Sequence, residues 1–151
     1  MRVDSLVPNR AILSELDALY LDSIRSIVTR DIPAAIKANA AILKLKPNDA
    51  QAYVDLGRAF EKNDQLDEAL NNYEIAFRLD PQHAAPSLRL GILRARKQDG
   101  AASKAAFDSA DALFQTLGDF EGRAEVLYQR GLVSKSMSQF QEADDQLRKA
   151  L

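Results

Sequence analysis

Few residues in this sequence have the type and spacing for chemistry. The single histidine, His83, stands far from any carboxylate pair, and we expect it to be a solvated loop residue. Two pairs of aspartates could suggest a metal site: Asp108 with Asp111, and Asp144 with Asp145. Neither pair comes with the spaced oxygen ligands and the glycine of a calcium loop. Both pairs are therefore expected on solvated helix faces.

Composition and motifs exclude several other kinds of catalytic site. Without cysteine there is no disulfide framework, thiolate nucleophile or cysteine-ligated zinc, and one histidine excludes a two-histidine site within a single chain. A glycine-rich phosphate loop, a G-x-S-x-G elbow and an H-E-x-x-H motif are all missing from the sequence. We predict a protein that is not an enzyme and that has no metal and no cofactor.

The bulk composition is that of a soluble globular protein. The 151 residues are 46% apolar and 28% charged, which fits one domain with a core. The net charge of -2 and the lack of a long single-sign run favour neither nucleic acid nor an anionic membrane as a partner. No signal-peptide pattern opens the chain, and no stretch reaches the roughly 18 apolar residues of a membrane span, so a cytoplasmic location is expected.

The elements that would position a site are helices in pairs. Two apolar stripes at helical spacing follow one another, the first at Tyr53, Leu56, Gly57 and Phe60, the second at Leu70, Tyr73, Ala76 and Phe77. The polar segment 63–65 predicts a turn between them, and Asp80-Pro81 predicts the end of the second helix. The unit is a helical hairpin.

The hairpin repeats along the chain. A shift of 34 residues superposes Pro47 on Pro81, Gly57 on Gly91, Tyr73 on Phe107 and Ala76 on Ala110. A further shift of 40 superposes Gly91 on Gly131, Phe107 on Leu147 and Ala110 on Ala150, with the extra length between Gln115 and Gly122. Periods of this size are typical of solenoids.

Residues 50–83 resemble the tetratricopeptide repeat (TPR), because Tyr53-x2-Leu56-Gly57-x2-Phe60, Ala69-x3-Tyr73 and Pro81 match its signature at every spacing. The resemblance implies an all-α, right-handed α-solenoid of stacked antiparallel hairpins, a TPR-like superhelix. Residues 1–151 would be a single domain, divided into a degenerate repeat at 10–47, the clear repeat at 50–83, a looser one at 84–117 and a longer one at 118–151. The last resembles the forty-residue variety found in regulatory and signalling proteins.

The first unit fits this pattern less well. We expect a helix from Arg10 to Thr29, with an inward face at Ile12, Leu16, Leu19, Ile24 and Ile27. A second helix should begin near Asp31 as N-cap, with Pro33 in its first turn. Strict register would place Asp22 and Ser23 at the Leu-Gly positions, so this repeat is degenerate or the alignment slips there by one residue.

Small and large residues alternate in the repeats because closely approaching helices need small residues, while aromatics fill the wider gaps between them. The expected structural core is Tyr53, Leu56, Gly57, Phe60, Ala69, Tyr73, Ala76, Gly91, Phe107, Ala110, Gly131 and Ala143.

The resemblance further implies that the first helix of each hairpin lines a concave groove. The expected groove residues are Val54, Arg58, Lys62, Leu88, Ile92, Arg96, Tyr128, Leu132 and Lys135. An apolar ladder with a basic margin suits an apolar or amphipathic partner with acidic flanks. Alternatively, Leu88, Ile92 and Leu132 are covered by the chain's own helices. Val54 and Arg58 replace residues of the carboxylate clamp, which disfavours binding of chaperone tails.

We therefore predict a non-catalytic scaffold that holds a partner peptide or helix in its groove. An alternative is a sensory or regulatory module of a larger signalling or transcription-control protein. A third hypothesis is homo-oligomerisation through an uncapped C-terminal end at Leu147, Ala150 and Leu151.

Overall fold

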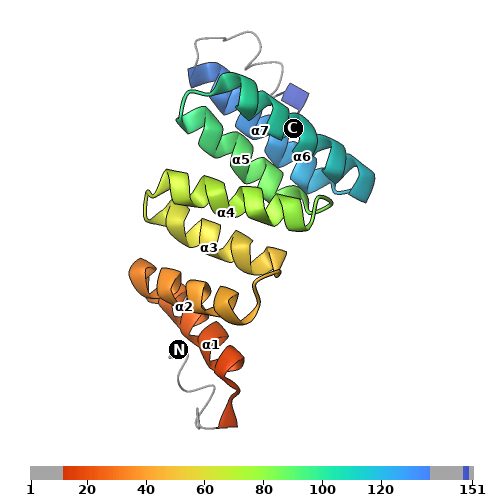
Figure 1. The fold of residues 1–151 in the computed structure, drawn as a ribbon. Coiled ribbons are helices and arrows are strands. Elements are labelled where there is room, and N and C mark those ends of the chain that lie inside the picture. The colour runs from red at the N-terminus through yellow and green to blue at the C-terminus, as the bar shows by residue number, and fades with distance from the viewer. Residues whose placement is uncertain (1–11, 137–147, 150–151) are drawn as a thin grey trace. The chain divides into compact units, whose positions relative to one another are not determined.

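The computed structural model of this chain describes residues 12–136 and 148–149. Its described part is all-α and has no strand (Figure 1). The seven helices named along it are α1 (Glu15–Val28), α2 (Ile32–Leu45), α3 (Ala50–Lys62), α4 (Leu66–Leu79), α5 (Ala84–Arg96), α6 (Gly100–Leu117) and α7 (Phe120–Ser136). The all-α class expected from the sequence is confirmed for this part of the chain.

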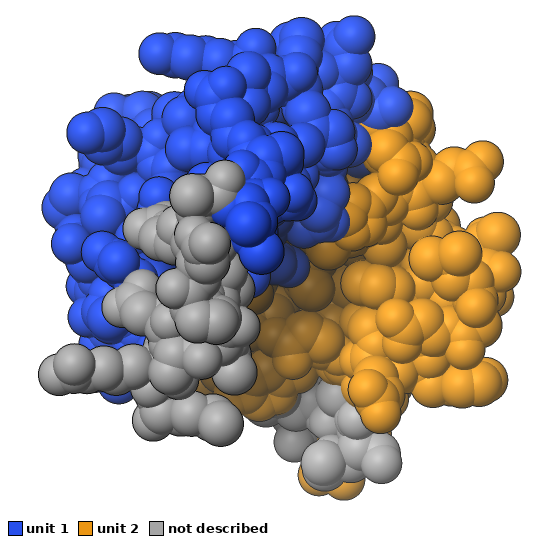
Figure 2. Space-filling view, turned by 90° about the horizontal axis from the view of Figure 1, so that it is seen from below, with its two compact units in different colours: residues 1–79 blue, residues 80–151 orange. Residues whose placement is uncertain are grey.

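The helices fall into two compact units, residues 1–79 and residues 80–151, coloured blue and orange in Figure 2. In the first unit α1 packs on α2, α2 on α3 and α3 on α4. In the second unit α5 packs on α6 and α6 on α7, and α5 also touches α7. Within each unit, helices that are neighbours in sequence are thus neighbours in space, as expected for stacked hairpins.

Aspartate side chains cap the start of several helices. Asp31, Asp49 and Asp99 each accept a hydrogen bond at 3.1 Å from the backbone N–H three residues on, at the start of α2, α3 and α6. Each bond satisfies one of the N–H groups that a helix N-terminus leaves without an intrahelical partner. The N-cap role expected for Asp31 is confirmed, and Pro33 lies in the first turn of α2.

The turns inside the hairpins repeat at a spacing of 34 residues. Arg30, Asp64 and Gln98 each adopt positive φ, at 59°, 58° and 63°. In each turn the next residue donates its backbone N–H to a carbonyl in the last turn of the first helix, with N–O distances of 2.8 to 3.0 Å. The same backbone path therefore reverses the chain in all three hairpins, and the predicted turn at 63–65 is one of them.

Helix α1 differs from its expected form. It begins at Glu15, where the Ser14 side chain accepts a hydrogen bond from the Asp17 N–H, rather than at Arg10. The inward face expected for Ile12, Ile24 and Ile27 is wrong, because all three are exposed. The residues that α1 buries are Ser23 and Ser26.

The reason is that α1 obeys the strict 34-residue register. Ser23 occupies the position of Gly57 in the next repeat, and Asn39 occupies the position of Tyr73. The Ser23 hydroxyl donates to Asn39 Oδ1 at 2.8 Å, and both side chains are buried. A hydrogen bond between two small polar groups thus occupies the place where the other hairpins pack glycine against an aromatic ring.

Glycine against an aromatic ring closes the next two hairpins. A Cβ added to Gly57 would lie 2.8 Å from Tyr73 Cε1, and one added to Gly91 would lie 2.6 Å from Phe107 Cδ1. Both distances are below van der Waals contact, so a side chain at either glycine would force the ring to move. Gly122 of α7 meets the Phe114 ring of α6 in the same way.

The described members of the expected core are placed as follows. Buried are Leu56, Gly57, Ala69, Tyr73, Ala76, Gly91, Phe107, Ala110 and Gly131. Tyr53 and Phe60 are half-buried. Ala143 lies outside the described residues.

Candidate binding surface

The residues with candidate chemistry are placed as follows in the described part of the chain. No group of three or more histidine, cysteine, aspartate or glutamate side chains within residues 12–136 and 148–149 could hold a metal ion. His83 is the N-cap residue of α5, and its side chain makes no capping hydrogen bond. Over the same residues no helix combines the length and hydropathy that a bilayer span requires.

The aspartates of α6 bind arginines instead of solvent alone. Asp111 Oδ1 accepts from Arg123 Nε at 3.0 Å, and Asp108 Oδ1 accepts from Arg130 at 2.7 Å. These two ion pairs join α6 to α7 along one side. Arg130 stands where the repeat signature has leucine, and its pairing with Asp108 explains how a charged residue is accommodated there. Asp144 and Asp145 lie outside the described residues.

The first helices of the two hairpins in residues 1–79 present side chains at equivalent positions. A shift of 34 residues places Ile24 on Arg58 and Val28 on Lys62, with Ile27 next to them. All five side chains are exposed: Ile24 by 54%, Ile27 by 45% and Val28 by 62%, together with Arg58 and Lys62. We call this set the α1–α3 face. Its α1 part is apolar, and its α3 part carries two basic side chains, of which Arg58 also pairs with Asp55.

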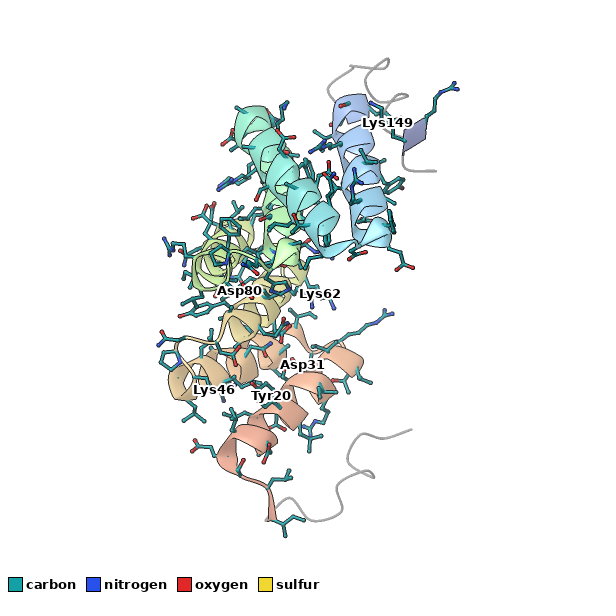
Figure 3. All side chains as sticks on the ribbon, turned by 90° about the vertical axis from the view of Figure 1, so that its right-hand side faces the viewer. Tyr20, Asp31, Lys46, Lys62, Asp80 and Lys149 are labelled. Atoms are coloured by element: carbon teal, nitrogen blue, oxygen red, sulfur yellow. The ribbon has the colours of Figure 1, made fainter. Side chains whose placement is uncertain are left out.

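The nearby acids of α3 are engaged within the helix pair. Asp55 lies 3.6 Å from Arg58, and Glu61 Oε2 accepts the hydroxyl of the buried Tyr73 at 2.8 Å. Lys62 closes α3 at its C-terminal end (labelled in Figure 3). A cation there interacts favourably with the helix dipole. Of the two bases of the α3 part, Lys62 therefore lies at the helix end, while Arg58 pairs with Asp55.

Val54, expected in the groove, is fully buried instead. It cannot reach a partner at the surface, so that part of the expectation is wrong. Val54 follows Tyr53 on α3 and is turned about 100° from it around the helix, and this direction leads into the core. Apolar residues at the equivalent position can therefore be interior in one repeat and exposed in another.

In the second unit, residues 80–151, some of the apolar residues expected in the groove are partly buried and others are exposed. Leu88 and Ile92 of α5 pack partly buried against the cluster of Phe107, Ala110 and Val126, the last of which belongs to α7. For these two residues the alternative interpretation applies, because the chain's own helices cover them in part. Tyr128 and Leu132 of α7 are 46% and 40% exposed. Arg96 and Lys135 are exposed.

An ion pair fixes the turn that leads into α3. Lys46 Nζ lies 2.6 Å from Asp49 Oδ2, and Asp49 also caps α3 (Lys46 and the neighbouring Tyr20 are labelled in Figure 3). The hydrogen bond from the Lys46 ammonium holds the pKa of the Asp49 carboxyl below its usual value. The same bond raises the pKa of Lys46. The start of the helix that carries Arg58 and Lys62 is thus held in place.

One predicted set of residues lies outside the described structure, and one exposed set was not predicted. The expected self-association residues Leu147, Ala150 and Leu151 lie outside the described residues. Ile24, Ile27 and Val28 were missed as exposed residues, although the 34-residue shift that aligned the other repeats places Ile24 and Val28 at the positions of Arg58 and Lys62. Strict register was the signal that would have found them.

Comparison with known proteins identifies the repeat. Residues 50–83 match the family model described as tetratricopeptide repeat. No curated protein sequence shows a significant match to the chain. The shared spacing of aromatic, glycine and alanine positions is therefore recognised at the level of the family.

Solved structures share the fold. The crystal structure of MamA is 19% identical with a TM-score of 0.76, covering 98% of this chain and 80% of that one. The TPR2B domain of yeast Sti1, in a complex with pHsp70, is 19% identical with a TM-score of 0.70, covering 87% and 97%. A chain of the APC/C hetero-tetramer Cut9–Hcn1 is 20% identical with a TM-score of 0.80, covering 99% and 27%.

Proposed function

Because the chain carries a tetratricopeptide repeat at residues 50–83 within an all-α, tetratricopeptide-like fold, we propose that it is a non-catalytic scaffold that binds a partner peptide or helix. We place the binding site on the α1–α3 face. The partner is an apolar or amphipathic segment with acidic flanks. The observation that carries the proposal is the exposure of Ile24 and Val28 at the positions equivalent to Arg58 and Lys62, together with the exposed Ile27 on the same helix.

The spacing on α1 suits such a partner. Ile24, Ile27 and Val28 follow the i, i+3, i+4 pattern that places side chains on one helix face. A partner helix in a groove is anchored by apolar side chains at the same spacing, while rim charges set its direction. Arg58 and Lys62 would supply those charges, and they favour carboxylates on the partner.

Similar structures support a role in protein interaction. One is a TPR domain in complex with pHsp70, and another is the CopN–Scc3 complex, which is 18% identical with a TM-score of 0.70. The fold is thus compatible with peptide and protein partners. The groove residues of this chain determine which partner it accepts, because a fold by itself does not specify a ligand.

A peptide-display selection tests the proposal. The parent is compared with an Ile24→Glu/Arg58→Glu variant, which reverses the chemistry of the α1–α3 face without touching a buried residue. The matched control is Lys44→Glu/Arg78→Glu, which changes charge at exposed positions of α2 and α4. Circular dichroism confirms that all three proteins are folded.

The parent and the control should enrich a common apolar motif with acidic flanks, and the face variant should lose it. If the face variant enriches the same peptides as the parent, the α1–α3 face is not the binding site. If the parent enriches no peptide at all, the scaffold proposal in this form is wrong.

A further inference from the structure

The connection from α6 to α7 exposes two large apolar side chains. Leu117, the last residue of α6, is 63% exposed, and Phe120, the first residue of α7, is 80% exposed. We call residues 117–121 the α6–α7 corner. It lies within the extra length that distinguishes the last repeat from the 34-residue ones. Exposed apolar side chains that gather in one place mark interaction sites when the patch is large enough.

The corner is held in one conformation by its backbone. Gly118 adopts φ of 68°, in the left-handed region that glycine occupies without strain. The Gly118 N–H donates to Gln115 O at 3.1 Å, and the Asp119 N–H donates to Phe114 O at 2.9 Å. These bonds close the end of α6, so the direction in which Leu117 leaves the helix is fixed.

The start of α7 is fixed as well. Asp119 Oδ1 accepts the Gly122 N–H at 2.8 Å, as an N-cap does. Gly122 lies against the Phe114 ring, which keeps the two helices in close contact at this end. A preorganised corner loses little conformational freedom when it binds, which favours association.

The corner also carries a defined charge. Between Leu117 and Gly122 the sequence has two acids, Asp119 and Glu121, and no base. The next residue, Arg123, is committed to Asp111. The corner is therefore an apolar segment with acidic flanks. This is the chemistry that the α1–α3 face is proposed to bind.

We infer that the α6–α7 corner of one copy of this chain binds the α1–α3 face of a second copy. Leu117 and Phe120 would contact the apolar α1 part, and the corner carboxylates would lie near Arg58 and Lys62. The inference rests on the proposed function, since it uses the same face. Because the two surfaces differ, the contact is heterologous and adds copies head to tail.

The test measures oligomeric state by sedimentation velocity over a wide range of concentration. The parent chain should exceed the monomer mass of 16.7 kDa increasingly as concentration rises. A corner variant, Leu117→Ser/Phe120→Ser, and a face variant, Ile24→Glu/Val28→Glu, should each lose this association. The matched control, Leu45→Ser/Leu79→Ser, removes two other exposed leucines and should associate like the parent.

Mixing the two variants gives a sharper result. The corner variant keeps an intact face and the face variant keeps an intact corner, so together they should form a 1:1 dimer that neither forms alone. A parent that stays monomeric at every concentration would overturn the inference. So would a corner variant that associates as the parent does, or a mixture that remains monomeric.

The outcomes separate this inference from the proposed function. A monomeric parent that still enriches acidic, apolar peptides would remove the inference and leave the scaffold proposal intact. A parent that forms head-to-tail oligomers, together with a monomeric corner variant that enriches no peptide, would support the inference and count against a foreign partner. The corner variant, as a monomer with an intact face, is the suitable protein for the peptide selection.

Discussion

Replacing Gly57 by alanine tests the packing of the central hairpin. The added Cβ would lie 2.8 Å from Tyr73 Cε1 and 3.1 Å from Tyr73 Cζ. The ring has little space to retreat, because Tyr73 is fully buried and its hydroxyl donates to Glu61 Oε2 at 2.8 Å. We therefore expect Gly57→Ala to lower the free energy of unfolding.

Two opposing effects set the magnitude. Alanine is favoured over glycine in a helix interior by about 1 kcal/mol. Overpacking of a well-packed core costs roughly 1 to 3 kcal/mol. Because the contact is with a ring fixed at both ends, the steric cost should exceed the helical gain, for a net loss of about 1 kcal/mol.

The assay is urea denaturation followed by circular dichroism, for the parent, Gly57→Ala, Tyr73→Leu and the double variant. In the Tyr73→Leu background the clash is absent, so Gly57→Ala should become neutral or stabilising. The coupling between the two positions should be clearly different from zero. A Gly57→Ala protein more stable than the parent, or additive effects across the four proteins, would refute the packing argument.

Three further predictions concern other contacts of the first unit. Ala69→Leu should lower the free energy of unfolding by about 1 to 3 kcal/mol in urea denaturation, because Ala69 is fully buried; an unchanged curve would mean that its packing face is misassigned. Ser23→Ala removes the hydrogen bond to Asn39, whose Nδ2 already has no hydrogen-bond partner among the described residues. This substitution should lower the free energy of unfolding by about 1 to 3 kcal/mol. Ser23→Gly/Asn39→Phe recreates the glycine–aromatic pair of the other two hairpins and should recover this loss in the same assay; a double variant no more stable than Ser23→Ala would contradict the equivalence. Lys46 holds the pKa of Asp49 down, so their contact stabilises the fold above the usual aspartate range and is lost as pH falls through the folded-state pKa. The melting-temperature difference between the parent and Asp49→Asn should therefore shrink below about pH 4, and a constant difference would oppose this assignment.

The hairpins could be predicted because their signal is local and typed. Glycine at residue 57 and the aromatic at residue 73 contact each other directly, so their spacing in sequence reports a spacing in the fold. The turns also repeat at residues 30, 64 and 98, since the same reversal needs the same backbone path. Where the apolar pattern and the 34-residue register indicated the same buried face, the sequence was sufficient to predict the helices.

Prediction failed where hydrophobicity and register disagreed. In α1 the isoleucines suggested an inward face, whereas Ser23 and Asn39 satisfy each other and hold the interior position. Because Ser23 faces the interior, the next residue, Ile24, is turned toward the surface. Val54 was predicted to be exposed and is buried. Burial of a residue beside the core stripe depends on the neighbouring helices, and the sequence of one repeat does not reveal where these lie.

The partners of α6 were also beyond sequence reasoning. Asp108 and Asp111 were expected in solvent, and their pairing with Arg130 and Arg123 depends on how α6 and α7 lie side by side. Ion pairs between helices have no fixed spacing in sequence. They become visible only when the backbone is placed.

The pairs that close the hairpins, Ser23 with Asn39, Gly57 with Tyr73 and Gly91 with Phe107, each join residues 16 apart in the chain. Contacts of such short sequence separation close small loops, and chains dominated by them fold quickly. The contact that closes each hairpin is thus local, which allows folding to start in any of them and spread to its neighbours. A substitution in one pair should therefore slow the formation of its own hairpin while leaving the other hairpins able to start.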